Sequence, residues 1–163
     1  MRGVEISLIT MNVKQSTFIN LPAEEVFAYI SNLENLVDWS SIVIALRKTS
    51  PGAVEVGTTF QGTIRFLTKW LSLTFEMVEY EPGRYLTLKS TSGASPCLVC
   101  YQFDPIKDGG ANVSLEIVIH HTEGIVELAT PVIESAVRRQ LEYDLLTLKD
   151  MLESRASMYQ IAD

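Results

Sequence analysis

The most reactive side chains in the sequence belong to two cysteines, Cys97 and Cys100, which stand three residues apart. This is the CxxC spacing of redox pairs, whose chemistry needs the two sulfurs side by side, usually at a helix start where the thiolate is stabilised. The surrounding residues predict a strand instead, and residues three apart on a strand point to opposite faces. We therefore expect two separate thiols that are buried or half-buried.

A zinc site is a second arrangement that these cysteines suggest, because His120 and His121 follow in the next predicted strand and four ligands are sufficient. Adjacent residues on a strand also point to opposite faces, so the geometry disfavours this site and we expect no metal or cofactor. His121 shares the parity of the inward-facing Ile117 at a strand end. It is a candidate proton shuttle or ligand contact, with a purely structural role as the alternative.

The remaining candidates are an arginine and four aromatic residues that carry a polar atom. Arg139 could orient a ligand carboxylate or enolate, although such side chains more often face water. Tyr101 and Tyr143 each carry a hydroxyl on a large apolar ring and could fix one end of a hydrophobic ligand. Trp39 and Trp70 could stack on an aromatic or quinone ligand, or could equally act as packing lids.

The composition argues against several classes of protein. The 163 residues suit one domain with one core, and the net charge of −7 opposes binding to a nucleic-acid backbone, which rests on Lys and Arg. No apolar run approaches the roughly 20 residues of a membrane helix, and the first residues lack the apolar core of a secretion signal. We expect a cytoplasmic protein that neither binds nucleic acid nor inserts into a membrane. The sequence leaves its oligomeric state open.

The periodicity of apolar residues predicts the elements that must position these groups. Pro22 marks the start of a helix after the first strand, and Ser31–Glu34 has the pattern of a capping box for a second short helix. Gly83 is placed where a type II turn requires it. An apolar stripe at steps of three and four residues predicts a long final helix, with Pro131 at its start or at a kink and a frayed tail after Arg155. The predicted strands cover residues 13–19, 42–46, 60–66, 71–77, 85–90, 99–103 and 113–119.

The order of these elements predicts an α+β fold with an internal cavity. A helix of about 20 residues is only about 30 Å long and 10 Å wide, so it cannot cover the apolar face of about seven antiparallel strands unless the sheet curls around it. The two short helices after strand one would plug one open end. The alternative is that the inward side chains meet in a solid core. The candidate cavity-lining residues are Trp39, Phe60, Ile64, Phe66, Leu73, Phe75, Leu88, Tyr101, Phe103, Ile117, His121, Val132, Arg139 and Tyr143.

Several segments resemble those of one known superfamily. They are residues 21–30 (LPAEEVFAYI), 33–35 (LEN) leading to Trp39, 56–60 (VGTTF), 75–86 (FEMVEYEPGRYL) and 101–103 (YQF), followed by the leucine-rich final helix. In this order they resemble the START-like or SRPBCC superfamily, with the polyketide cyclase/dehydrase and coenzyme Q-binding group as the nearest branch. The resemblance covers about residues 12–155 and implies a single helix-grip domain. Residues 1–11 would then be an upstream extension, with Met11 as an alternative start.

The function that these features favour is binding of a hydrophobic or amphipathic molecule, such as a lipid, a quinone or a polyketide-like compound, by a carrier or sensor. No nucleophile-elbow, zinc-protease, P-loop or dinucleotide-binding pattern occurs. The alternative is a cyclase or dehydratase that positions a poly-keto chain and moves protons in a water-poor cavity. The residues that would do so are Tyr101, His121, Arg139 and Tyr143. A third hypothesis is an interaction module whose cavity has lost its use.

Overall fold

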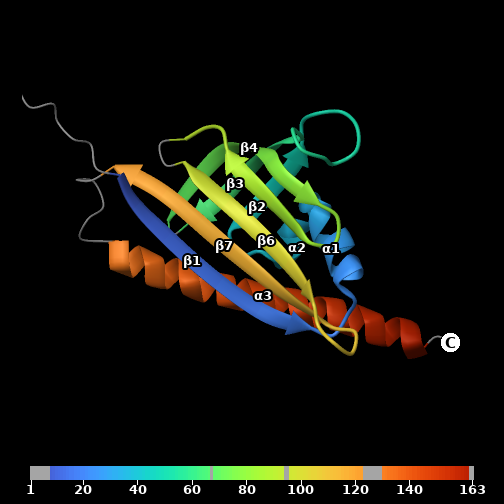
Figure 1. The fold of residues 1–163 in the computed structure, drawn as a ribbon. Helices are drawn as coiled ribbons and strands as arrows, with labels where there is room; N and C mark the ends of the chain where they lie inside the picture. The colour runs from blue at the N-terminus through green and yellow to red at the C-terminus, as the bar shows by residue number, and fades with distance from the viewer. Residues whose placement is uncertain (1–7, 67, 94–95, 123–129, 162–163) are drawn as a thin grey trace, which may run out of the picture.

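The computed structural model describes residues 8–66, 68–93, 96–122 and 130–161 (Figure 1). In chain order the elements are β1 (Leu8–Ile19), α1 (Ala23–Ser31), the 3-10 turn η1 (Leu33–Asn35), α2 (Leu36–Trp39), β2 (Val43–Lys48), β3 (Thr59–Phe66), β4 (Lys69–Glu81), β5 (Tyr85–Ser90), β6 (Cys97–Pro105), β7 (Ala111–Thr122) and α3 (Thr130–Ile161). The α+β fold with seven strands, two short helices after the first strand and a long C-terminal helix is as predicted.

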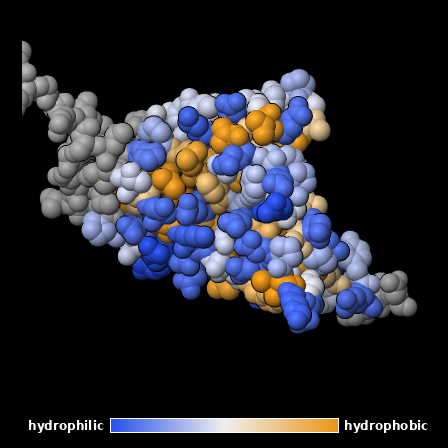
Figure 2. All heavy atoms as spheres, in the orientation of Figure 1, coloured by the Kyte–Doolittle hydropathy of each residue, from blue (hydrophilic) through white to orange (hydrophobic). Residues whose placement is uncertain are grey.

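The seven strands form one antiparallel sheet in the order β1-β7-β6-β5-β4-β3-β2. Because β1 returns beside β7, the first and last strands of the chain lie together, and α3 runs along them beneath the sheet (Figure 1). The helices α1 and α2 lie at one end of the curved sheet. This is a helix-grip arrangement. The convex face of the sheet carries mostly hydrophilic side chains with apolar ones interspersed, as strands that are wet on one side require (Figure 2).

The two short helices lie where the sequence predicts them, and the details of their starts differ from the prediction. Pro22 precedes α1 with φ of −55°, and no side chain caps the helix. The predicted capping box at residues 31–34 is wrong, because the Ser31 hydroxyl donates backwards to the carbonyl of Ala28 at 3.3 Å. The connection is held instead by Asn35, whose Nδ2 donates to the Tyr29 carbonyl at 3.0 Å. A side-chain amide thus fixes the approach of α2 to α1.

The turn and the helix boundaries test two further predictions. Gly83 has φ of +77°, and the Arg84 N–H donates to the Glu81 carbonyl at 3.0 Å, so the predicted turn between β4 and β5 is confirmed. The final helix begins at Thr130 and continues past Arg155, where fraying is predicted, to Ile161. The reason lies in the sequence, since no Gly or Pro follows residue 155 to stop the helix.

One end of the molecule has a solid core. Phe27 of α1 contacts Phe103 of β6 edge-on, with ring centroids 5.2 Å apart, and Tyr80 of β4 at 5.5 Å. Val113 of β7 and Leu148 of α3 belong to the same buried core and are fully buried. The C-terminal half of α3 therefore faces packed side chains, which leaves its N-terminal half to face a different environment.

Candidate functional site

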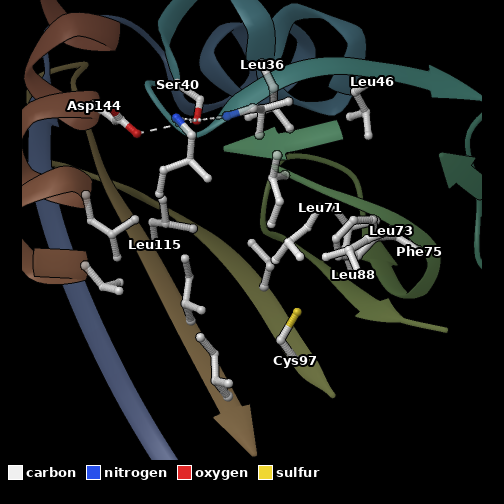
Figure 3. A pocket seen from close by; sticks show the side chains of 18 of the residues that line it. Leu36, Ser40, Leu46, Leu71, Leu73, Phe75, Leu88, Cys97, Leu115 and Asp144 are labelled. Atoms are coloured by element: carbon white, nitrogen blue, oxygen red, sulfur yellow. Dashed lines mark hydrogen bonds between the residues drawn. The ribbon is translucent and has the colours of Figure 1, made fainter. Parts of the chain in front are cut away.

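A cavity of about 330 Å³ lies between the concave face of the sheet and the N-terminal half of α3. Figure 3 shows its side chains converging from the strands and the helix. Its lining is formed by Met11, Leu36, Trp39, Ser40, Ile42, Val43, Leu46, Phe60, Ile64, Leu71, Leu73, Phe75, Leu88, Cys97, Val99, Tyr101, Leu115, Ile117, Ile119, Ile133, Val137, Leu141 and Asp144. Nearly all of these side chains are apolar, so the cavity is a hydrophobic compartment.

Strand register places most of the predicted residues in this cavity. Phe60 lies opposite Phe75 on β3 and β4, and Ile117 lies opposite Val99 on β7 and β6. Directly opposed residues share one face of a sheet, so these pairs all point towards α3. The predicted residues that line the cavity are Trp39, Phe60, Ile64, Leu73, Phe75, Leu88, Tyr101 and Ile117.

Four other predicted residues lie elsewhere. Phe103 has the expected parity, but it packs against Phe27 in the solid core, beyond the end of the cavity. Val132 and Tyr143 are 69% and 64% exposed, and Arg139 is also exposed. The prediction that these three α3 residues line the cavity is wrong, because the inward stripe of the helix runs through other positions. The side chains of Phe66 and His121 lie outside the described part of the structure.

Asp144 is the main polar residue of the cavity that the sequence interpretation missed. Only 2% of it is exposed, and it continues the inward stripe of Val137 and Leu141 at a helical step. Its Oδ2 accepts the hydroxyl of Ser40 at 3.4 Å, as Figure 3 shows. Its Oδ1 accepts the backbone N–H of Ser41 at 3.0 Å. Burial raises the pKa of Asp144, and the hydrogen bonds from the two serines oppose that rise. The sequence feature that identifies Asp144 is a carboxylate in phase with the apolar stripe of the final helix.

Ser40 orients this carboxylate from the end of α2. Its backbone N–H donates to the Leu36 carbonyl at 2.8 Å and ends the helix. Its Oγ accepts the backbone N–H groups of Ile42 and Val43, both at 3.2 Å. Because the two lone pairs of the hydroxyl are occupied by these donors, its proton is free to point to Asp144. The α2–β2 connection and α3 are therefore joined at the cavity wall.

Two aromatic residues complete a polar end of the cavity. The rings of Trp39 and Tyr101 meet edge-on, with centroids 6.4 Å apart. Burial and the negative charge of Asp144 both raise the pKa of Tyr101, so its hydroxyl stays protonated at neutral pH. Among the described residues, Trp39 Nε1 is a buried side-chain donor with no hydrogen-bond partner. We refer to Trp39, Ser40, Tyr101 and Asp144 as the polar end.

The cysteines lie on opposite faces of β6, as predicted. Cys97 lies opposite Ile119 and its sulfur points into the cavity, whereas Cys100 lies opposite Glu116 (Figure 3). Both thiols are free and half-buried, and burial raises the pKa of each. This arrangement separates the sulfurs of the CxxC motif, so Cys97 is a lining side chain of the cavity.

Comparisons with known proteins agree with the fold. The model of the family described as polyketide cyclase / dehydrase and lipid transport matches residues 10–153. The Zhui aromatase/cyclase from Streptomyces sp. R1128 superposes with a TM-score of 0.75 at 12% identity, over 91% of this chain and 96% of that chain. A START superfamily protein from Mycobacterium smegmatis gives a TM-score of 0.74 at 9% identity, over 88% of this chain and 98% of that chain. A protein from Thermus thermophilus, TTHA0849, gives a TM-score of 0.74 at 17% identity, over 88% of this chain and 98% of that chain.

These identities are low, so the structural likeness shows a common fold and no more. No curated protein matches the sequence significantly. None of the described helices combines the length and the apolar character needed to cross a membrane. The resemblance that the sequence predicted is confirmed by the family match, which extends over most of the chain. The chain has a START-like fold and belongs to the polyketide cyclase / dehydrase and lipid transport family.

Proposed function

We propose that this protein binds a hydrophobic or amphipathic small molecule in its cavity and acts as a carrier or sensor of that molecule. The observation that carries the proposal is the cavity of about 330 Å³ with an almost wholly apolar lining. Ligand pockets commonly measure about 300–1,000 Å³ and pair an apolar wall with a few polar groups that set orientation. The polar end supplies such groups here. A small ligand fits this volume better than a large lipid with several chains.

Binding without turnover is supported by the chemistry of the lining. Asp144 is engaged by the two serines, and the raised pKa of Tyr101 makes its hydroxyl a poor proton donor near neutral pH. Proton-transfer catalysis works best with groups whose pKa lies near the operating pH. In the described part of the chain, no histidine, lysine or arginine lines the cavity to supply a second such group.

A cyclase or dehydratase activity is the second candidate, and one observation favours it. Burial raises the pKa of Asp144 and so makes this carboxylate a stronger base, inside a cavity that excludes water. A base of this kind could remove a proton next to a ligand carbonyl, with Tyr101 close by. Of the other residues first considered for this role, Arg139 and Tyr143 face the solvent.

The experiment that tests the proposal is mass spectrometry of the purified protein with a panel of quinones, fatty acids, sterols and poly-keto compounds. We expect a one-to-one adduct whose ligand extracts unchanged. Loss of water from a panel compound only in the presence of the protein would establish the enzyme instead. If no compound gives an adduct with the wild-type protein, the binding proposal is contradicted.

A matched pair of variants shows whether binding occurs in the cavity. Val99 is half-buried and lines the cavity, so Val99→Phe places a ring in the space that a ligand would use. Leu98 is the preceding residue on β6 and points to the other face of the sheet, so Leu98→Phe adds similar bulk outside the cavity. We expect the first variant to lose the adduct at least tenfold and the second to retain it.

A further inference from the structure

One end of the cavity opens to the surface, as the exposure of its lining shows strand by strand. On β4 the inward-facing Phe75 is buried, Leu73 is half-buried and Leu71 is 40% exposed. On β3, which pairs with β4, Phe60 is buried, and Ile64, which lies opposite Leu71, is half-buried. The lining therefore becomes more exposed towards the hairpin that joins β3 to β4.

The other walls of the cavity open in the same direction. On β6 the exposure rises from the buried Tyr101 to the half-buried Cys97, where the strand begins. On α3 it rises from the buried Val137 to the half-buried Ile133, and Val132 beside it is exposed. The helix α3 begins and the strand β7 ends on this side of the molecule (Figure 1). We refer to this opening of the cavity as the mouth.

The hairpin at the mouth carries an exposed surface that is both apolar and basic. Trp70 is 62% exposed, and it follows the sheet on the opposite face from its neighbour Leu71, because successive residues of a strand alternate. Arg65 is exposed and lies directly opposite Trp70 on the paired strand. Lys69 is exposed and shares the face of Leu71, two residues away. Each of the two exposed apolar side chains therefore has a cation close by.

The charge of this hairpin is opposite to that of the whole chain. Residues 56–75 contain Arg65 and Lys69 and no Asp or Glu, whereas the net charge of the 163 residues is −7. Exposed charges separated by more than about 10 Å are largely screened at 0.1 M salt. A charged surface that approaches the mouth is therefore governed by the local positive charge of the hairpin.

The composition of this surface favours an anionic bilayer as its partner. Segments that bind at a bilayer interface combine Trp, Phe or Leu with Lys and Arg, and each cation is attracted by anionic lipids. Basic side chains can keep their charge in water while their stems lie along apolar material. A second copy of the chain is a poorer partner, because a two-fold interface brings the same patch of both subunits together and would oppose the cations of one hairpin to those of the other.

We propose that the mouth docks on an anionic lipid surface through Trp70, Arg65 and Lys69, with the cavity open towards the bilayer. A hydrophobic ligand then passes between bilayer and cavity without crossing water. The contact is peripheral, since a few side chains enter the interface and no segment spans the bilayer. The inference goes beyond the proposed ligand binding, because docking is a property of the ligand-free protein.

Vesicles of phosphatidylcholine, with and without phosphatidylglycerol, test the docking of the ligand-free protein. Co-sedimentation measures the bound fraction, and tryptophan fluorescence reports the environment of Trp70, since Trp39 is already buried and its emission should change little. We expect binding to the anionic vesicles to be at least tenfold tighter than binding to the neutral ones. The emission should shift to the blue on binding, and added salt should weaken the binding.

Three variants assign the docking to the mouth. Trp70→Ser removes the exposed indole and should weaken binding to the anionic vesicles at least fivefold. The double variant Arg65→Glu, Lys69→Glu should weaken it at least tenfold, because each cation near an anionic surface changes the affinity about fivefold. Tyr159→Ser is the matched control and should bind as the wild type does, since Tyr159 is 78% exposed near the other end of α3. Thermal unfolding checks that all variants are folded.

The outcomes separate this inference from the proposed function. If the wild type does not bind the anionic vesicles, or if the charge-reversed variant binds them equally well, docking through the mouth is contradicted. A loss in Tyr159→Ser as large as that in Trp70→Ser contradicts it as well. A dimer that Trp70→Ser dissociates, without binding of the wild type to vesicles, would show that the mouth faces a second copy instead. The ligand panel is run without vesicles, so it tests the proposed function independently of these results.

Discussion

Two valines on the concave face of the sheet provide a test of whether the cavity is open in solution. Val99 on β6 lines the cavity and is half-buried, whereas Val113 on the neighbouring strand β7 is fully buried in the core and does not line the cavity. Val113 lies opposite Phe103, which fills the solid end. The perturbation is the same at both sites, Val→Ile, which adds one methylene and keeps the side chain β-branched and suited to a strand.

The structure predicts effects of opposite sign. At Val113 the added methylene enters a packed core, where overpacking costs typically about 1–3 kcal/mol. At Val99 it enters the cavity, where burying one methylene contributes about 0.8 kcal/mol of stability. The free energies of unfolding of the two variants should therefore differ by about 2–4 kcal/mol. With a urea dependence of about 2 kcal/mol per molar, the unfolding midpoints should lie about 1–2 M apart.

The assay is urea unfolding of the ligand-free proteins, followed by far-UV circular dichroism and tryptophan fluorescence. The slopes with urea should agree between the variants, since a changed slope would indicate a changed denatured state. If Val99→Ile unfolds at the same urea concentration as Val113→Ile or below it, the space beside Val99 is filled in solution. The reasoning from a preformed cavity would then be refuted.

Three further predictions follow from the site and the turn. Burial raises the pKa of Asp144, so between its unfolded and folded pKa values the native state binds more protons than the unfolded state, and stability falls as pH rises. The unfolding free energy of the wild type relative to Asp144→Asn should therefore decrease from pH 3 to pH 7. A flat or rising difference would contradict this prediction. A bound ligand should slow alkylation of Cys97 at least tenfold and that of Cys100 less than twofold, measured by peptide mass spectrometry, whereas equal protection would place the ligand outside the cavity. Gly83→Ala should lower the free energy of unfolding by about 1 kcal/mol, because alanine is strained at this positive φ. Steric contact adds nothing, since the nearest atom to the new Cβ is Glu24 Cγ at 3.8 Å. The midpoint of thermal unfolding should decrease by about 2–4 °C, and an unchanged midpoint would mean that the turn adapts.

The strands could be predicted well from the sequence because the physics of a half-buried strand is local. Apolar and polar residues alternate, and once one face is buried the register of each pair is fixed. Phe60 and Phe75 are an example, because alternation alone predicts that both point inward, and both line the cavity opposite each other.

The predictions for cavity residues on the final helix are wrong for a different reason. Tyr143 and Arg139 are candidates because of the chemistry of their side chains, whereas burial on a helix depends on a rotation of about 100° per residue. The stripe through Val137 and Leu141 continues to Asp144, one residue beyond Tyr143. The phase of this stripe therefore predicts that Asp144 faces inward. A charged residue in phase with leucines is the sequence feature that identifies it.

The extent of the cavity along each strand could not be predicted from alternation. Tyr101 and Phe103 have the same parity on β6, yet the first lines the cavity and the second packs against Phe27. The difference arises from α1, which inserts an aromatic ring at one end of the sheet. Which part of a concave face is filled depends on contacts between elements distant in the sequence.

The division of α3 between a solid end and a hollow end has a consequence for stability. Leu145 and Leu148 pack into the closed core and secure the helix, so the sheet can remain curved over an unfilled space farther along. The hollow end instead carries the costs of the buried Asp144 and the unpaired Trp39 donor. A ligand that fills the space and binds the native state alone should stabilise the fold by RT ln(1 + [L]/Kd). Because the unfilled space lies at the hollow end, hydrogen exchange there should slow most when a ligand binds.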